Sequence, residues 1–389
     1  MRIAFYAPLK SPDHPVPSGD RRVGRLLVQA LEHAGHEVAL VSSLRTYEPD
    51  GNPSRQLQLR DAGLAEGHAL AQAWEKGDRP PDLWFTYHVY YKAPDWLGPT
   101  VSRALGIPYV IAEASFAPKR AGGPWSIGHE AAEEAIRAAS LVLCPTRDDM
   151  ACVKAVAEPS AKVEWLPPFL DPIPYQTAAR DRVAHREKLA LQYGLDQSVP
   201  WIVVVAMMRP GDKVASFRML AATLGKMKDI AWRVVIAGDG AARKEVEDLI
   251  EAAVPGRACF LGERSAADLA AIYAACDVCL WPAVNEAYGM AMLEAQAAGV
   301  PIVSRLVRGV PDVVCDGQTG LLAPAGDDEA FARGARELLV DSEKRVAFGQ
   351  AAAHFAGGER SLAATALRLR VTLAELGGCV SRPAAASRA

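Results

Sequence analysis

The first part of the chain alternates short apolar runs with stretches of helical periodicity. An apolar run at 3–7 leads into a loop rich in Pro, Ser and Gly, and apolar residues then recur at helical spacing over 20–34. Gly35 is expected to end this helix, and 36–41 to form the next strand. A strand, a helix and a strand in this order form a βαβ unit, which indicates a parallel sheet. Further strands are expected at 83–87, 109–112, 141–144 and 163–166.

The second part repeats this organisation. The continuous β-branched run at 201–206 is typical of a strand covered on both faces. Further strands are expected at 233–237, 258–261, 278–282 and 301–304, with helices at 216–226, 242–253 and 289–298. Between the two parts, four prolines within 166–174 predict a stiff linker. The fold class is therefore α/β, with two Rossmann-like doubly wound domains whose ligands are expected at the carboxyl ends of the strands.

Composition and charge exclude several classes of protein. The 389 residues are 50% hydrophobic and 23% charged, as in ordinary globular proteins. With 43 basic and 46 acidic residues the net charge is −3, so no nucleic-acid partner and at most peripheral membrane contact are expected. The apolar runs are too short for a signal peptide or a membrane span. Cys276 and Cys279 are interpreted as core thiols rather than a redox pair. A cytoplasmic protein is expected.

The stretch 285–301 carries the most specific chemical pattern. Glu286 lies in the loop after a predicted strand, Gly289 lies at a predicted helix start, and Glu294 follows on that helix. Glycine allows a ligand close to the backbone, and the free N–H groups of a helix start bind phosphate oxygens. The Glu294 side chain leans back toward that start, where a carboxylate can accept hydrogen bonds from vicinal hydroxyls. The alternative is that Glu294 is a solvated helix position and Glu286 only an acidic residue favoured by the helix dipole.

This stretch resembles the motif of the retaining nucleotide-sugar glycosyltransferases of the GT-B fold, family 4 type, or glycosyl transferases group 1. The motif comprises an acidic residue, an aromatic-Gly pair and a second Glu, which correspond to Glu286, Tyr288, Gly289 and Glu294. The resemblance implies two domains facing across a cleft, with the acceptor side in 1–170 and the nucleotide-sugar donor side in 171–355. It also implies that helices in 356–380 pack back on the N-terminal domain. A disordered tail is expected at 381–389.

Two basic residues follow the predicted strand at 201–206. Arg209 and Lys213 lie where a guanidinium fork and an ammonium can hold one diphosphate. Taken alone, basic residues in a Gly/Pro loop are usually solvated surface. The resemblance implies that this pair holds the diphosphate of the donor.

Other residues complete the expected donor site. Gly238 and Gly240 are expected to turn the chain beside the nucleotide, since the third glycine of the Rossmann fingerprint is absent. The resemblance implies that the main chain at Leu261 passes near the base and that the amide of Gly19 approaches the donor phosphate. Met290, at the start of the predicted helix, is included among the donor-binding residues.

The N-terminal domain departs from the family pattern. Ser18 stands where many members have a second glycine, and Glu113 follows the fourth strand where many members have a histidine. His88 follows an earlier strand and His129 opens a helix, and a lone histidine is usually an ordinary surface or core residue. These differences leave acceptor recognition open.

The resemblance implies transfer of a sugar from a nucleotide-diphosphate donor to a hydroxyl acceptor, in cell-surface polysaccharide or glycoconjugate synthesis. Arg209 and Lys213 would neutralise the leaving diphosphate, Glu294 would hold the ribose and Glu286 would orient the transferred sugar. No metal and no cofactor are expected, since the sequence has no Asp-x-Asp and the basic pair can replace a cation. Two alternatives stay open: another GT-B enzyme, such as a nucleotide-sugar epimerase, or a non-catalytic sugar-nucleotide-binding protein.

Overall fold

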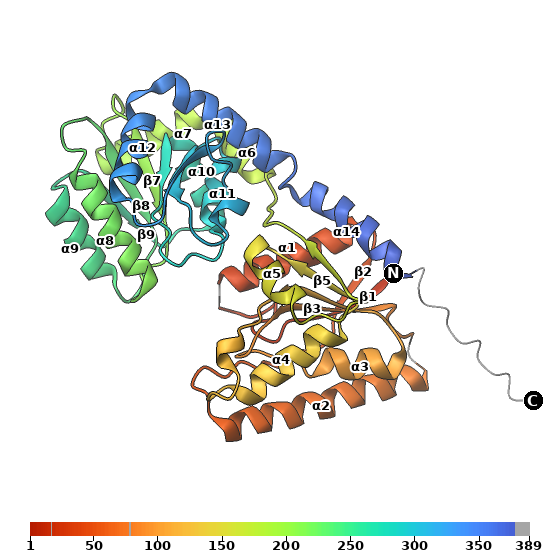
Figure 1. Cartoon of the computed structure of the whole chain (residues 1–389). Coiled ribbons are helices and arrows are strands. Elements are labelled where there is room, and N and C mark those ends of the chain that lie inside the picture. The colour runs from red at the N-terminus through yellow and green to blue at the C-terminus, as the bar shows by residue number, and fades with distance from the viewer. Residues whose placement is uncertain (17, 78, 378–389) are drawn as a thin grey trace, which may run out of the picture. The chain divides into compact units, whose positions relative to one another are not determined.

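A computed structural model describes residues 1–16, 18–77 and 79–377 of the chain (Figure 1). It divides into two compact units. Unit 1 consists of Met1–Pro167 and the segment that starts at Leu362, and unit 2 consists of Pro168–Ser361. The chain thus leaves unit 1 close to the boundary expected at 170 and returns later than the expected 356. The tail expected at 381–389 lies outside the described residues.

Unit 1 is built on one parallel sheet in the order β2-β1-β3-β4-β5-β6. The central strands are buried on both faces, which explains why their sequences are apolar without alternation. The order reverses direction between β1 and β3, which makes this pair the switch point of the sheet. The strands are β1 Arg2–Tyr6, β2 Glu37–Leu40, β3 Leu83–Val89, β4 Tyr109–Ala114, β5 Leu141–Cys144 and β6 Lys162–Trp165.

Helices cover both faces of this sheet. In Figure 1, α2, α3 and α4 lie together on one face, while α1, α5 and α14 lie on the other. Ser18 caps α1 by accepting a hydrogen bond from the amide of Arg21, which accounts for a serine at this position. The helices are α1 Gly19–His33, α2 Pro53–Lys76, α3 Leu97–Leu105, α4 Ser126–Ala138, α5 Arg147–Lys154 and α14 Leu362–Gly377, with a 3₁₀ turn at Pro118–Arg120.

Unit 2 has a second parallel sheet, in the order β12-β11-β10-β7-β8-β9. Read from β9, this is the order of the dinucleotide-binding fold, and its switch point lies between β7 and β10. The strands are β7 Trp201–Val205, β8 Arg233–Ala237, β9 Ala258–Gly262, β10 Val278–Leu280, β11 Ile302–Arg305 and β12 Gly320–Ala323.

Two groups of helices enclose this second sheet (Figure 1). α8 packs against α9 and α12, whereas α10 packs against α6 and α7, and α11 packs against α13. The helices are α6 Ile173–Arg180, α7 Arg182–Tyr193, α8 Asp212–Gly225, α9 Arg243–Ala253, α10 Ala266–Ala275, α11 Met290–Ala297, α12 Asp328–Val340 and α13 Ser342–Gly357, with a 3₁₀ turn at Val310–Asp312.

The segments at the start and at the end of unit 2 are joined to each other. Leu170 forms an isolated parallel bridge with Ser361, and its amide donates to the carbonyl of Arg360 at 3.0 Å. Both ends of unit 2 are therefore fastened at one place.

Two local predictions from the sequence were wrong, and one strand was missed. α8 begins at Asp212, ahead of the expected 216, because Gly211 adopts a left-handed φ of 89° and turns the chain directly into the helix. Lys213 therefore lies in the first turn of a helix and not in a loop. The expected linker at 166–174 ends inside α6, where Pro174 occupies a first-turn position that tolerates proline. The strand β12 was not predicted.

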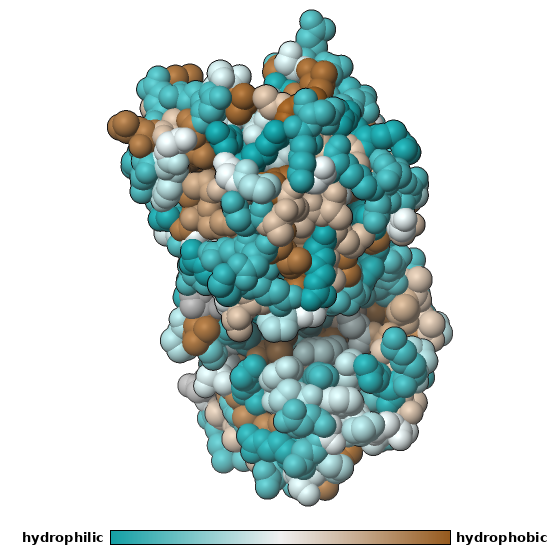
Figure 2. All heavy atoms as spheres, turned by 90° about the vertical axis from the view of Figure 1, so that its left-hand side faces the viewer, coloured by the Kyte–Doolittle hydropathy of each residue, from teal (hydrophilic) through white to brown (hydrophobic). Residues whose placement is uncertain are grey.

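The face of the molecule in Figure 2 is mostly hydrophilic, with apolar residues in small patches. Within the described ranges, no helix combines the length and the apolar character needed to cross a membrane.

Candidate active site

The carboxyl ends of β7 and β10, at the switch point of unit 2, bring Lys213 and Glu286 together. The Lys213 Nζ atom donates to Glu286 Oε2 at 2.5 Å, and the Trp281 indole N–H donates to the same oxygen at 3.1 Å. The ammonium also lies 5.4 Å from the centroid of the Trp281 ring. The side chains of Lys213 and Glu286 are 22% and 18% exposed, so solvent screens this ion pair only partly. The glutamate is held in place from both the strand end and the helix.

The loop between β10 and α11 is fastened to α8 on one side. Asn285 Nδ2 donates to Asp212 Oδ2 at 2.9 Å, and the amide of Val284 donates to Ser216 Oγ at 3.0 Å. These contacts attach the loop to the same helix turn that carries Lys213. The geometry of the ion pair is therefore set by the fold and not by the two side chains alone.

The other side of this loop is held by the turn after β11. The Arg308 guanidinium donates to Asn285 Oδ1 at 2.9 Å, and the amide of Gly309 donates to the carbonyl of Ala287 at 2.9 Å. Ala283, Asn285 and Arg308 have positive φ values of 58°, 51° and 41°. Such strained conformations persist only where contacts with the surrounding structure hold them, and they concentrate at functional sites.

The start of α11 shows why glycine follows Tyr288. Gly289 has a φ of 76°, and a Cβ atom there would lie 2.3 Å from the methyl carbon of Met292. Gly289 has no side chain that could cap this helix end, and the amide of Met292 donates to its carbonyl at 3.0 Å, so the amides of Met290 and Ala291 are the candidate donors beside Glu286. Tyr288 and Met290 flank the turn and pack partly buried against the core of unit 2.

Glu294 is a buried residue, only 4% exposed, so the interpretation of a solvated helix position was wrong. The Tyr273 hydroxyl lies 3.3 Å from its Oε2 atom. Burial, with the Glu294 charge adding to it, raises the pKa of Cys279 to about 12. A thiol with such a pKa is protonated at neutral pH, which fits a core role for this cysteine.

The glycines after β8 have a steric role. Gly238 and Gly240 have φ values of 143° and 149°, and Cβ atoms there would lie 1.9 and 2.4 Å from the carbonyl oxygens of Ala206 and Met208. The close approach joins the loops after β7 and β8, since the amide of Met208 donates to the carbonyl of Asp239.

The remaining predicted donor residues lie around these glycines. Leu261 is buried in β9, and the amide of Gly238 donates to the carbonyl of Gly262 at 2.9 Å. Arg209 lies exposed in the loop after β7, before the turn into α8. The structure thus places Arg209, Lys213, Gly238, Gly240 and Leu261 at adjacent strand ends of one sheet.

Unit 1 holds the remaining predicted residue and a cluster that the sequence did not predict. Gly19 is the first residue of α1, with open space around its Cα atom. His88 Nδ1 lies 3.2 Å from Asp20 Oδ1 and 3.6 Å from Glu113 Oε1. His129 is instead a core residue, 4% exposed and stacked on Phe116.

The charged groups of this cluster shift each other's pKa values. Burial by itself would lower the pKa of His88, but the carboxylates of Glu113 and Asp20 outweigh it, so this pKa is raised. Burial by itself would raise the pKa of Asp20, but the hydrogen bond and charge of His88 outweigh it, so this pKa is lowered. Both shifts favour the charged pair.

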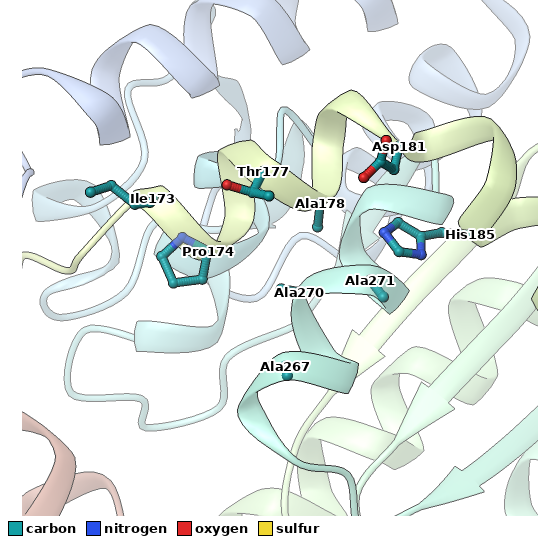
Figure 3. A pocket seen from close by; sticks show the side chains of 9 residues that line it. All are labelled: Ile173, Pro174, Thr177, Ala178, Asp181, His185, Ala267, Ala270 and Ala271. Atoms are coloured by element: carbon teal, nitrogen blue, oxygen red, sulfur yellow. The ribbon is translucent and has the colours of Figure 1, made fainter.

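A further pocket of about 360 Å³ lies on unit 2 between α6, α7 and α10 (Figure 3). Its walls are mainly small or apolar side chains, and Asp181 and His185 are its ionisable residues. The lining contains none of the residues predicted from the sequence. Within the described part of the chain, no group of three or more His, Cys, Asp or Glu residues is placed to hold a metal ion.

Comparison with known proteins agrees with the geometry of unit 2. The family model described as glycosyl transferases group 1 matches residues 186–355. The D-inositol 3-phosphate glycosyltransferase of Corynebacterium glutamicum is 32% identical over 222 residues, which cover 55% of this chain and 50% of that protein. The chain thus spans about half the length of this curated relative.

Solved structures match almost the whole chain at low identity. Sucrose-phosphate synthase from Thermosynechococcus elongatus superimposes with a TM-score of 0.72 at 18% identity, covering 97% of this chain and 100% of that one. The Anabaena protein HepE, in complex with UDP, gives a TM-score of 0.72 at 17% identity, covering 96% and 100%. These likenesses show the GT-B fold, and residues 186–355 of unit 2 are similar to the family of glycosyl transferases group 1.

Proposed function

We propose that this chain is a retaining glycosyltransferase that transfers a sugar from a nucleoside-diphosphate sugar to a hydroxyl acceptor. The observation that carries the proposal is the ion pair of Lys213 and Glu286 at the switch point of unit 2, beside the uncapped start of α11. In this arrangement, Lys213 supplies a cation for the diphosphate and the start of α11 supplies amide donors for its oxygens. Glu286 supplies a carboxylate for the sugar at the same place.

The leaving group is the part of the reaction where charge develops. Arg209 and Lys213 are proposed to hold the diphosphate and to stabilise its growing negative charge, which makes a divalent metal unnecessary in this scheme. Lys213 pairs with Glu286 in the structure, so donor binding would redirect the ammonium from one anion to another. No cofactor takes part, since the nucleotide sugar is the substrate.

The two glutamates are proposed to have different partners. Glu286 receives hydrogen bonds from Lys213 and Trp281, and both contacts reduce the nucleophilicity of its carboxylate. We therefore assign Glu286 to orienting the transferred sugar rather than to forming a covalent bond with it. Glu294, on the helix whose first N–H groups are proposed to bind the phosphates, is assigned to the ribose.

The acceptor class is proposed from the relatives. Curated relatives are named for D-inositol 3-phosphate, a phosphorylated cyclitol, and a small polyol of this kind is the acceptor that we propose to test first. Synthesis of a polysaccharide or another glycoconjugate would be the corresponding biological role.

The proposal is tested by incubating the full chain with UDP-glucose, GDP-mannose and ADP-glucose, each with D-inositol 3-phosphate, glucose 6-phosphate or no acceptor. Release of nucleoside diphosphate together with a new glycoside whose anomeric configuration matches that of the donor supports a retaining transferase. A changed donor sugar in the absence of any acceptor would instead indicate an epimerase. Tight donor binding without turnover, with these acceptors and with a cell extract, would indicate a binding protein.

A further inference from the structure

The switch point of unit 1 carries a charged cluster whose place matches that of the ion pair in unit 2. Asp20 lies in the first turn of the helix that follows β1, and His88 lies near the end of β3, so the two residues flank the switch point. Glu113 lies near the end of the neighbouring strand β4. Three segments that are distant in sequence thus place ionisable groups at one edge of the sheet.

The ladder between β3 and β4 places His88 beside Glu113. The ladder pairs Tyr87 with Ala112 and Val89 with Ala114, so His88 and Glu113 occupy the position between these two pairs on their strands. Both residues have a φ of 64°, a left-handed conformation that is unfavourable for side chains of this size. Two strained residues at the same rung of one ladder indicate a local distortion that brings both side chains to the edge of the sheet.

The cluster is partly shielded but remains accessible. The side chains of His88, Glu113 and Asp20 are 17%, 15% and 38% exposed. The Nδ1 atom of His88 faces both carboxylates, so its Nε2 atom points to the opposite side of the ring. A protonated imidazole in this setting offers a second N–H donor next to carboxylate acceptors.

Aromatic rings continue from this cluster along the loop after β3. The His88 ring lies 5.1 Å from that of Tyr90, which contacts Tyr91 at 5.5 Å, and Tyr91 contacts Trp125 at 5.6 Å. Faces of aromatic rings pack against the C–H face of a sugar or cyclitol, while carboxylate and imidazole groups exchange hydrogen bonds with its hydroxyls.

Cations complete this surface. Lys92 lies 4.5 Å from the Trp125 ring, and Arg120 lies 5.0 Å from the ring of Tyr91. An ammonium and a guanidinium beside a polyol site suit a phosphate substituent on the ligand. The surface therefore combines groups for a ring, for hydroxyls and for a phosphate.

We propose that Asp20, His88 and Glu113, with Tyr90 beside them, bind the polyol ring of the acceptor, and that His88 positions a hydroxyl of that ring. This inference rests on the proposed glycosyl transfer, for which it names the acceptor-binding residues. The competing explanation is that the cluster only fastens α1 to the sheet.

The test compares three variants of the full chain. His88→Asn keeps a residue that tolerates left-handed backbone and retains a donor, but it carries no charge. Glu113→Gln removes the facing charge with little change of shape. His33→Asn is the matched control, because His33 is exposed at the far end of α1, where its Nδ1 atom lies 2.8 Å from the carbonyl oxygen of Gln29 in its own helix.

Two measurements are made on each variant. Histidine ring signals are followed by NMR while myo-inositol, D-inositol 3-phosphate, glucose and glucose 6-phosphate are added at millimolar concentration. Calorimetry with UDP reports separately on the donor site of unit 2. We expect at least one polyol to shift the His88 signals, and His88→Asn and Glu113→Gln to weaken its binding tenfold or more, with UDP affinity unchanged and His33→Asn like the parent chain.

The outcomes separate the two proposals. If UDP binds but no polyol of the panel shifts the His88 signals, or if a polyol binds equally well to both cluster variants, the acceptor site is not here. If UDP itself does not bind, the proposed glycosyl transfer is contradicted, independently of the acceptor site. A stronger response to the phosphorylated polyols assigns a role to Lys92 and Arg120, and an equal response restricts recognition to the ring. Should His88→Asn fail to fold, the signals of the parent chain and Glu113→Gln decide.

Discussion

Lys213 and Glu286 are 73 positions apart in the sequence, yet their charged atoms lie 2.5 Å from each other at the switch point of the second sheet. The pair joins the first turn of α8 to the loop before α11. Each residue neutralises the charge of the other, which would otherwise be largely buried without a counter-charge. In the proposed function, a nucleoside-diphosphate donor would bring its own negative charge and would compete with Glu286 for the ammonium.

This competition gives different expectations for the two glutamates. Glu286→Gln removes the anion that holds Lys213, so UDP affinity should be unchanged or higher, while transfer should fall by roughly 10²–10³ because only the sugar and its transition state contact this residue. Glu294→Gln should weaken UDP binding by about 1.5–3 kcal/mol, since the ribose is present in UDP. Calorimetry with UDP and a transfer assay measure both effects. A larger loss of UDP affinity in Glu286→Gln than in Glu294→Gln would reverse the proposed placement of the donor.

The diphosphate contacts can be tested by truncation. Lys213→Ala and Arg209→Ala should each weaken UDP binding by about 1.5–3 kcal/mol, the range for a hydrogen bond to a charged group. Binding of uridine, which lacks the phosphates, should barely change. Arg218→Ala is the control, because Arg218 lies on the same helix α8 in an exposed ion pair with Glu245. Equal losses for UDP and uridine would identify Lys213 and Arg209 as structural residues.

The cluster of unit 1 predicts a pH-dependent stability. The groups that face His88 are Asp20 on α1, Glu113 on β4 and Asp149 on α5, and Lys10 acts on Asp20. Because the folded pKa of His88 is raised, its contribution to stability is fully present below the unfolded value of about 6.5 and is lost as the pH rises through the folded pKa. The melting temperature of the parent chain relative to His88→Asn should therefore be highest near pH 5.5 and decrease toward pH 8.5. A difference that is independent of pH would show that His88 is not charged in the folded chain.

The glycine contacts predict a stability effect without any ligand. Gly238→Ala would place a Cβ atom 1.9 Å from the carbonyl oxygen of Ala206, in a backbone conformation that alanine avoids, and should lower the free energy of unfolding by about 2–4 kcal/mol. Gly225→Ala is the matched control. Gly225 is the last residue of α8 and has open space around it, so alanine there should be neutral or stabilise by about 0.5–1 kcal/mol. Denaturant unfolding of the two variants distinguishes these outcomes.

The sequence predicts the two sheets well because their signal is local. The run at 201–206 has no polar positions, and the observed β7 is buried on both faces. The residues with specific spacing, Glu286 and Glu294, lie in the loop after β10 and on α11, as the sequence predicts. In contrast, the start of α8 depends on the turn at Gly211. The Gly/Pro composition of this segment does not show whether the chain turns there or continues as an extended loop.

The histidine cluster could not be predicted from local patterns. It depends on the register of β3 with β4, and on left-handed conformations at residues that are not glycine. The burial of Glu294 likewise depends on Tyr273, which comes from another helix. Long-range packing decides such features, and the periodicity of a single segment carries no information about them.

Unit 2 is an insertion within unit 1, and the bridge between Leu170 and Ser361 holds its two ends together. During synthesis, unit 2 is complete before the ribosome has made α14, while unit 1 still lacks the helix that packs on α1. Within the described residues it is therefore α14, and not the first sheet, that completes the assembly of the N-terminal unit. The neighbouring ends also make unit 2 suitable for excision as a separate domain, with a short peptide closing the remaining gap in unit 1.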